Sequence, residues 1–268
     1  MATAARRRHN EKILRPVWPN AGLEAEFRRK LYDLIEEMNR SFSYWIKAAY
    51  RADPPVMALD VTPAVQIRIA INKLSRRWQK RFDVASKELA KYFTTAMNKR
   101  SDKVLMAILK KGGWTVRFQM TPAMKDIMKA TIAEQVGLIR SIPQQYLVNV
   151  QSMVMQSVKV GRDLGPLAKE IEKQYGVTKR RAALIARDQN NKATASMIRA
   201  RQVEVGIKKA VWLHSGGGKT PRKSHVANSG KTYSTDTGWY DPNEKKWIFP
   251  GELINCRCVS HSLIRGFS

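Results

Sequence analysis

The chain has 268 residues, of which 49 are lysine or arginine and 22 are aspartate or glutamate, so its formal net charge is +27. Hydrophobic residues make up 43% of the sequence, enough for the core of one large domain or two modest ones. An excess of this size argues against a generic small-molecule enzyme, and its spread along the whole chain indicates that the folded body itself is positive. It favours a polyanionic partner, either nucleic acid or an anionic membrane surface.

The two cysteines, Cys256 and Cys258, are too few for a disulfide framework and too close together for an ordinary bridge. This cysteine usage fits a reducing compartment. The N-terminus contains Arg6, Arg7 and Arg8 but no apolar run behind them, so we expect no signal peptide. No stretch approaches about 18 apolar residues, so we expect no membrane span.

Residues 1–20 are basic and contain two prolines, which is typical of an extended arm. Apolar residues then recur at spacings of three and four from Leu23 to Ile46, with Trp45 among them, and predict a long helix. Thr62-Pro63 and Thr121-Pro122 are start signals for further helices. We expect the helices to be broken at three places, namely near Asn98 to Ser101, at Pro143 and at Gly176.

After Gly206 the sequence becomes rich in glycine, serine, threonine and asparagine, with short apolar segments that predict strands at 209–213, 231–233, 246–249 and 257–260. The predicted fold class is therefore α+β, with a long, mostly helical N-terminal region followed by a small β-rich C-terminal module. We divide the chain into a basic arm (1–20), a helical region (21–160) and a C-terminal domain (161–268). That domain is helical to about residue 205 and β-rich over 206–268.

One segment of the second predicted helix carries cations without a balancing acid between residues 68 and 81. Such an uncompensated face suits a polyanion better than a balanced one. No base-reading motif is present, so we expect sequence-independent contact with nucleic acid. The predicted contact residues are Arg6, Arg7, Arg8, Arg68, Lys73, Arg76, Arg77, Lys80 and Arg81.

Cys256, Cys258 and His225 form a candidate metal site, because thiolate and imidazole are the ligands that zinc favours. A structural zinc ion would stabilise a module of about 60 residues, which can bury only a small core. Two alternatives remain open. The cysteines pack as plain buried thiols, or His214 and His261 take part in the site.

A metal-dependent nuclease or other phosphodiester enzyme centred on His225 and the Cys pair is the alternative function. Such enzymes normally supply carboxylates to the metal. The acids of this region lie in polar stretches with no evident pairing, and they are Asp236, Asp241, Glu244 and Glu252. We therefore assign no catalytic residue and no organic cofactor.

The C-terminal part resembles the phage Mu protein F-like family, the minor head or head morphogenesis proteins of tailed bacteriophages. The resemblance rests on an ordered set of residues over roughly 165–265 that ends in Asn-Cys-Arg-Cys. The set comprises Arg187, Asp188, Trp212, Arg222, His225, Gly230, Pro250, Asn255, Cys256, Arg257 and Cys258. The chain departs from the family in having Gly216-Gly217-Gly218 where an acidic residue is usual.

The resemblance implies a non-enzymatic virion component, made in the host cytoplasm and located inside the head near the portal vertex. Its implied partners are the portal protein, packaged double-stranded DNA and the major capsid or scaffold proteins. Its implied role is in head assembly and in the packaging or ejection of DNA. Some relatives carry a toxin domain after this module; because the sequence ends at Ser268, we expect none here.

Overall fold

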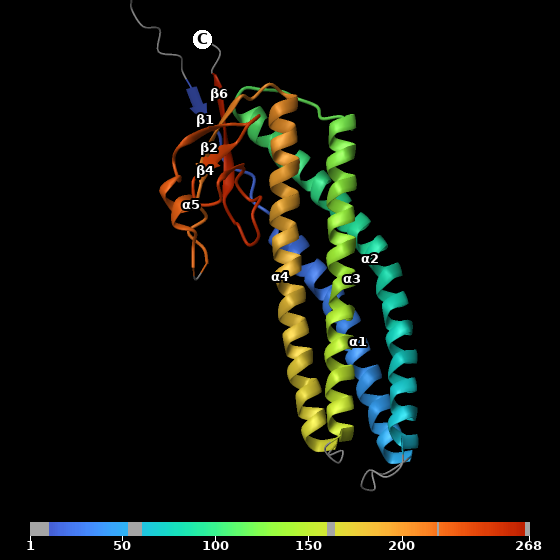
Figure 1. Cartoon of the computed structure of the whole chain (residues 1–268). Helices are drawn as coiled ribbons and strands as arrows, with labels where there is room; N and C mark the ends of the chain where they lie inside the picture. The colour runs from blue at the N-terminus through green and yellow to red at the C-terminus, as the bar shows by residue number, and fades with distance from the viewer. Residues whose placement is uncertain (1–10, 53–60, 160–163, 219, 266–268) are drawn as a thin grey trace, which may run out of the picture. The chain divides into compact units, whose positions relative to one another are not determined.

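The computed structural model describes residues 11–52, 61–159, 164–218 and 220–265 (Figure 1). After one short strand come four long helices and then a small strand-rich part, which confirms the predicted α+β class. Arg6, Arg7 and Arg8 lie outside the described residues. The helices are α1 (Ala21–Ala52), α2 (Val61–Lys111), α3 (Pro122–Lys159) and α4 (Leu164–Glu204).

The chain forms two compact units, each assembled from segments that are not consecutive. The first unit, here called the helical unit, comprises Glu24–Phe93 and Thr131–Arg187. The second, here called the mixed unit, comprises Met1–Leu23, Thr94–Ala130 and Asp188–Ser268. Segments of α2, α3 and α4 belong to each of the two units, so the units are not consecutive stretches of the chain. The division predicted from sequence, by contrast, consists of consecutive stretches.

The helical unit buries the apolar faces of its helices against one another. Phe27 of α1 stacks on Phe93 of α2 with ring centroids 4.4 Å apart, and Phe42 meets the edge of Tyr146 at 5.8 Å. The predicted stripe on α1 is confirmed except at Trp45, whose side chain is 48% exposed. Trp45 precedes the buried Ile46, so a helical step of 100° turns it away from the centre of the apolar face.

The three predicted helix breaks are wrong, since α2, α3 and α4 continue through them. Asn98 and Ser101 lie on the buried side of α2, and Pro143 lies between the buried Ile142 and Tyr146 of α3. Just beyond Gly176, the hydroxyl of Thr178 donates to the carbonyl of Gln174. Tertiary packing of the flanking residues outweighs the local preference at each position.

The mixed unit contains a four-stranded antiparallel sheet in the order β1-β6-β2-β3 and a separate β4-β5 hairpin. Residue pairs that fix the register include Lys12 with Ile264 and Ala210 with both Ser262 and Tyr233. A short helix, α5 (Lys223–Ala227), lies between β2 and β3 in the chain. The strands are β1 (Glu11–Ile13), β2 (Lys209–Leu213), β3 (Thr232–Ser234), β4 (Trp239–Asp241), β5 (Lys246–Ile248) and β6 (Val259–Arg265).

The described part of the predicted N-terminal arm is a sheet strand followed by core residues, so the arm prediction is wrong there. β1 pairs with β6, and Leu14 donates its backbone N–H to the carbonyl of Ser262 at 2.9 Å. Leu14 and Val17 are buried in one cluster with Leu105, Leu109, Ile198, Ile207 and Ile264. The apolar residues Leu14 and Val17 account for this outcome, because they supply surface that the unit can bury. In the part of the chain that the structure describes, no helix is apolar over a length that could cross a membrane.

Candidate metal centre

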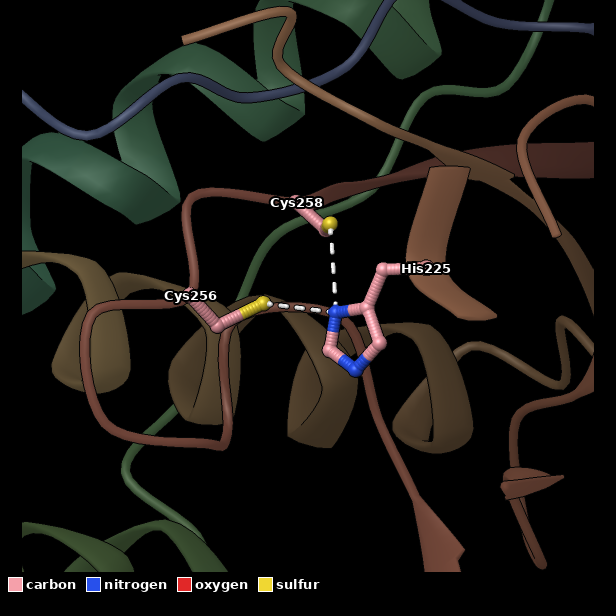
Figure 2. A group of neighbouring side chains, drawn as sticks. All are labelled: His225, Cys256 and Cys258. Atoms are coloured by element: carbon pink, nitrogen blue, oxygen red, sulfur yellow. Dashed lines mark hydrogen bonds between the residues drawn. The ribbon is translucent and has the colours of Figure 1, made fainter. Parts of the chain in front are cut away.

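Two separate segments of the mixed unit bring His225, Cys256 and Cys258 together (Figure 2). His225 lies on α5, and the two cysteines lie in the loop that leads into β6. All three side chains are buried, with exposed fractions between 2% and 4%. Figure 2 shows both sulfur atoms directed at the same ring nitrogen.

The donor atoms are close enough to share one ion. The Sγ atoms of Cys256 and Cys258 lie 3.4 Å and 3.7 Å from Nδ1 of His225. The three donor atoms lie within 4.8 Å of one another. His214 and His261 belong elsewhere, because Nδ1 of His214 accepts the N–H of Gly216 and Nδ1 of His261 contacts the carbonyl of Leu14.

The opposite nitrogen of the imidazole faces a carboxylate that the sequence did not single out. Nε2 of His225 lies 3.5 Å from Oδ2 of Asp241, whose side chain is fully buried. Asp241 is itself held by the hydroxyl of Ser224 at 3.0 Å and by the backbone N–H of Asn243 at 2.9 Å. The expectation that this acid is unpaired in a polar loop is therefore wrong.

The two thiols interact, and their proton affinities move in opposite directions. A hydrogen bond from Cys258 lowers the pKa of Cys256 to about 4, and contact with His225 adds to this lowering. The same hydrogen bond, together with burial, raises the pKa of Cys258. Cys256 is therefore the thiol of the pair that loses its proton more readily.

Aromatic rings enclose the three side chains. The ring centroid of Trp212 lies 5.1 Å from that of His225, and the ring centroid of Trp239 lies 6.4 Å from it. Trp212 and both cysteines belong to one buried cluster with Ala210, Tyr233, Ile248 and Leu253. An apolar surrounding of this kind keeps water away from the donor atoms.

The loop that presents the cysteines is fixed by the C-terminal half of α4. Asp188 accepts the backbone N–H of Asn255 at 2.6 Å, and Asn191 donates its side-chain amide to the carbonyl of Cys256 at 3.3 Å. Asn255 has a positive φ of 59°, a conformation that asparagine tolerates better than most residues. Several members of the sequence signature therefore act together in shaping this loop.

The remaining signature residues flank the same region. Arg222 donates to the carbonyl of Ile254 at 3.2 Å and forms an ion pair with Glu244 at 3.5 Å. Gly230 has φ of 84° and donates its N–H to the carbonyl of Trp212 at 2.8 Å, so it forms a turn before β3. Pro250 is buried, and Arg187 and Arg257 are half-buried.

The cations predicted to contact nucleic acid form a separate feature, on α2 within the helical unit. Arg68, Lys73, Arg76, Arg77, Lys80 and Arg81 are all exposed. Arg81 differs from the others, because it pairs with Glu37 of α1 and lies over the ring of Trp78. Among the described residues, the other five make no ion pair.

Comparison with known proteins agrees with the sequence signature. Residues 148–261 match the model of the family described as Phage Mu protein F like protein, which confirms the resemblance for this part of the chain.

One relative is described only as "Uncharacterized protein", from Haemophilus influenzae. It is 37% identical over 139 residues, which cover 52% of this chain and 30% of that protein. The chain thus spans less than a third of the length of this relative. No solved structure matches the chain.

Proposed function

We infer that this protein is a structural minor head protein of a tailed bacteriophage, present in the virion and associated with the portal. The observation that carries the inference is the family match over residues 148–261. The burial of His225, Cys256 and Cys258 supports a structural role over the nuclease alternative, because a phosphodiester cannot reach donor atoms on side chains that are at most 4% exposed.

The basic surface supports direct contact with packaged DNA. Lys73, Arg76, Arg77 and Lys80 recur at helical spacings of three and four, so they form one stripe on α2, here called the basic stripe. The stripe covers about 10 Å at 1.5 Å per residue, a length that spans about three phosphates of a DNA strand. Its contact would displace counterions and read no sequence.

Binding of the full chain to random-sequence duplex DNA across a salt series tests the proposed contact with DNA. The logarithm of the binding constant should fall linearly with the logarithm of salt concentration, with a slope of about −0.9 per phosphate contacted. Affinity that stays flat between low and high salt contradicts the proposed contact with DNA.

An exposed aromatic pair on α1 supports docking to a protein partner. Tyr44 is 66% exposed and Trp45 is 48% exposed, and their rings meet edge to face at 5.4 Å. Aromatic side chains dominate the binding energy of protein interfaces. We assign this pair to the surface that contacts the portal protein.

Co-purification with the portal protein encoded by the same phage tests the proposed docking to the portal. The wild-type chain should co-purify at low and moderate salt, and Tyr44→Ser with Trp45→Ser should reduce the recovered portal at least tenfold. Val148→Ser is the matched control, because Val148 is also 66% exposed in the helical unit. Absence of portal with the wild-type chain at both salt levels would overturn the docking proposal.

A further inference from the structure

The pattern of contacts around Nδ1 of His225 is difficult to explain by hydrogen bonding alone. This single nitrogen offers either one lone pair or one N–H, and therefore one good hydrogen bond. Two sulfur atoms nevertheless approach it, at 3.4 Å and 3.7 Å. A shared cation accounts for both contacts at once.

The separations agree with those of a tetrahedral zinc site. Bond lengths of about 2.3 Å to sulfur and about 2.0 Å to nitrogen, at the tetrahedral angle, place neighbouring sulfur and nitrogen ligands about 3.5 Å apart. The two measured separations from Nδ1, 3.4 Å and 3.7 Å, bracket this value. The donor-atom separations thus fit one tetrahedral ion.

Asp241 completes the arrangement from the far side of the ring. Histidines that bind zinc usually donate their second ring N–H to a carboxylate or carbonyl, which fixes the tautomer and the ring orientation. Asp241 faces Nε2 at 3.5 Å and is anchored by Ser224 and Asn243. With the proton on Nε2, facing this carboxylate, the Nδ1 lone pair would be directed at the cysteines, as metal binding requires.

We propose that His225, Cys256 and Cys258 bind one Zn²⁺ ion that holds α5 to the loop before β6, with Asp241 as the positioning residue. The described residues supply three ligands, and one of the four tetrahedral positions is left for a further donor. The ion cross-links a module whose strands are only three to seven residues long.

Metal content of the full chain, purified without chelators or a metal-affinity column, is the first test. We expect about one zinc per chain by elemental analysis in the wild type, and less than about 0.2 in Cys256→Ser and Cys258→Ser. His261→Gln is the matched control and should keep about one zinc, because His261 lies outside the cluster. Asp241→Asn should bind zinc with about 10- to 100-fold lower affinity.

A second measurement on the wild type removes the ambiguity of a variant that fails to fold. Cobalt(II) added to the metal-free chain should give the visible bands of a tetrahedral site and a thiolate charge-transfer band, and both should disappear when zinc is added. A wild-type chain with native circular dichroism that takes up less than about 0.2 zinc after zinc addition overturns the proposal. So does a zinc-free chain whose two thiols are joined in a disulfide.

Discussion

Gly251 is a position in the mixed unit where only glycine fits. Its φ of +84° lies in the left-handed region, and a Cβ built there would lie 2.7 Å from Cβ of Ala195. Ala195 lies on α4, and the carbonyl of Cys258 would be 3.3 Å from the same Cβ. The close approach of the 250–258 loop to α4 thus depends on the missing side chain.

Gly251→Ala should lower the free energy of unfolding by about 1–3 kcal/mol, because both the backbone conformation and the contact with Ala195 become strained. Gly137→Ala is the matched control. Gly137 lies in α3 with nothing within 4 Å of a built Cβ, so alanine should stabilise the helix by about 0.5–1 kcal/mol. Urea unfolding of both variants measures the difference, and equal midpoints would contradict the close-packing argument.

The residues of the candidate metal centre were partly predictable from sequence. His225, Cys256 and Cys258 stand out because thiolate and imidazole carry a recognisable chemistry. Asp241 does not stand out, because nothing in its local sequence reveals that the β4-β5 hairpin buries it against α5. A positioning carboxylate reaches its histidine only through the tertiary fold, so no spacing in a single sequence reveals it.

Arg201 joins three elements of the mixed unit. Its guanidinium forms a two-pronged hydrogen bond with Asp102 of α2, at 2.8 Å for both contacts, and also bonds Glu204 of α4 at 2.6 Å. It donates to the carbonyl of Gln119 at 2.7 Å and lies over the ring of Phe118. Its side chain is 1% exposed, so each of these contacts replaces lost hydration.

Arg201→Ala should lower the free energy of unfolding by about 3–5 kcal/mol, since it leaves Asp102 largely buried without its cation. Arg201→Lys keeps the charge but cannot reproduce the planar fork, so its loss should be smaller but clear. Arg180→Ala, at an exposed position of α4, is the control and should change the free energy by no more than about 0.5 kcal/mol. Thermal and urea unfolding measure all three variants. A loss of unfolding free energy in Arg201→Ala as small as that of the control would contradict the proposed role of Arg201 in joining these elements.

Element boundaries show where local sequence rules hold and where they fail. The start signals at Thr62-Pro63 and Thr121-Pro122 predicted the starts of α2 and α3 to within a residue or two. Pro143 and Gly176 did not act as breaks, because an interior position in a packed helix is held by its neighbours as well as by its own preference. The pairing of β1 with β6 was not predictable, since it joins residues about 250 positions apart.

On the scale of the whole molecule, the main feature is the formal net charge of +27. Surface lysines and arginines are ordinarily balanced by acids on the same helix face, as Lys169 and Lys173 are by the neighbouring Glu170 and Glu172 of α4. The basic stripe of α2 lacks that balance. Its apolar neighbours Leu74, Trp78 and Phe82 are buried, so the stripe is fixed outward by packing.

A matched pair of variants separates local contact from total charge. Lys73→Gln with Lys80→Gln removes two exposed charges from the basic stripe, and Lys169→Gln with Lys173→Gln removes two exposed charges from α4. If the stripe contacts phosphates, the first pair should reduce the magnitude of the salt slope of DNA binding by about 2, at about 0.9 per contact, and the second should leave it nearly unchanged. Equal effects of the two pairs would mean that the net charge attracts DNA without a defined contact surface, and the assignment of DNA contact to α2 would then be wrong.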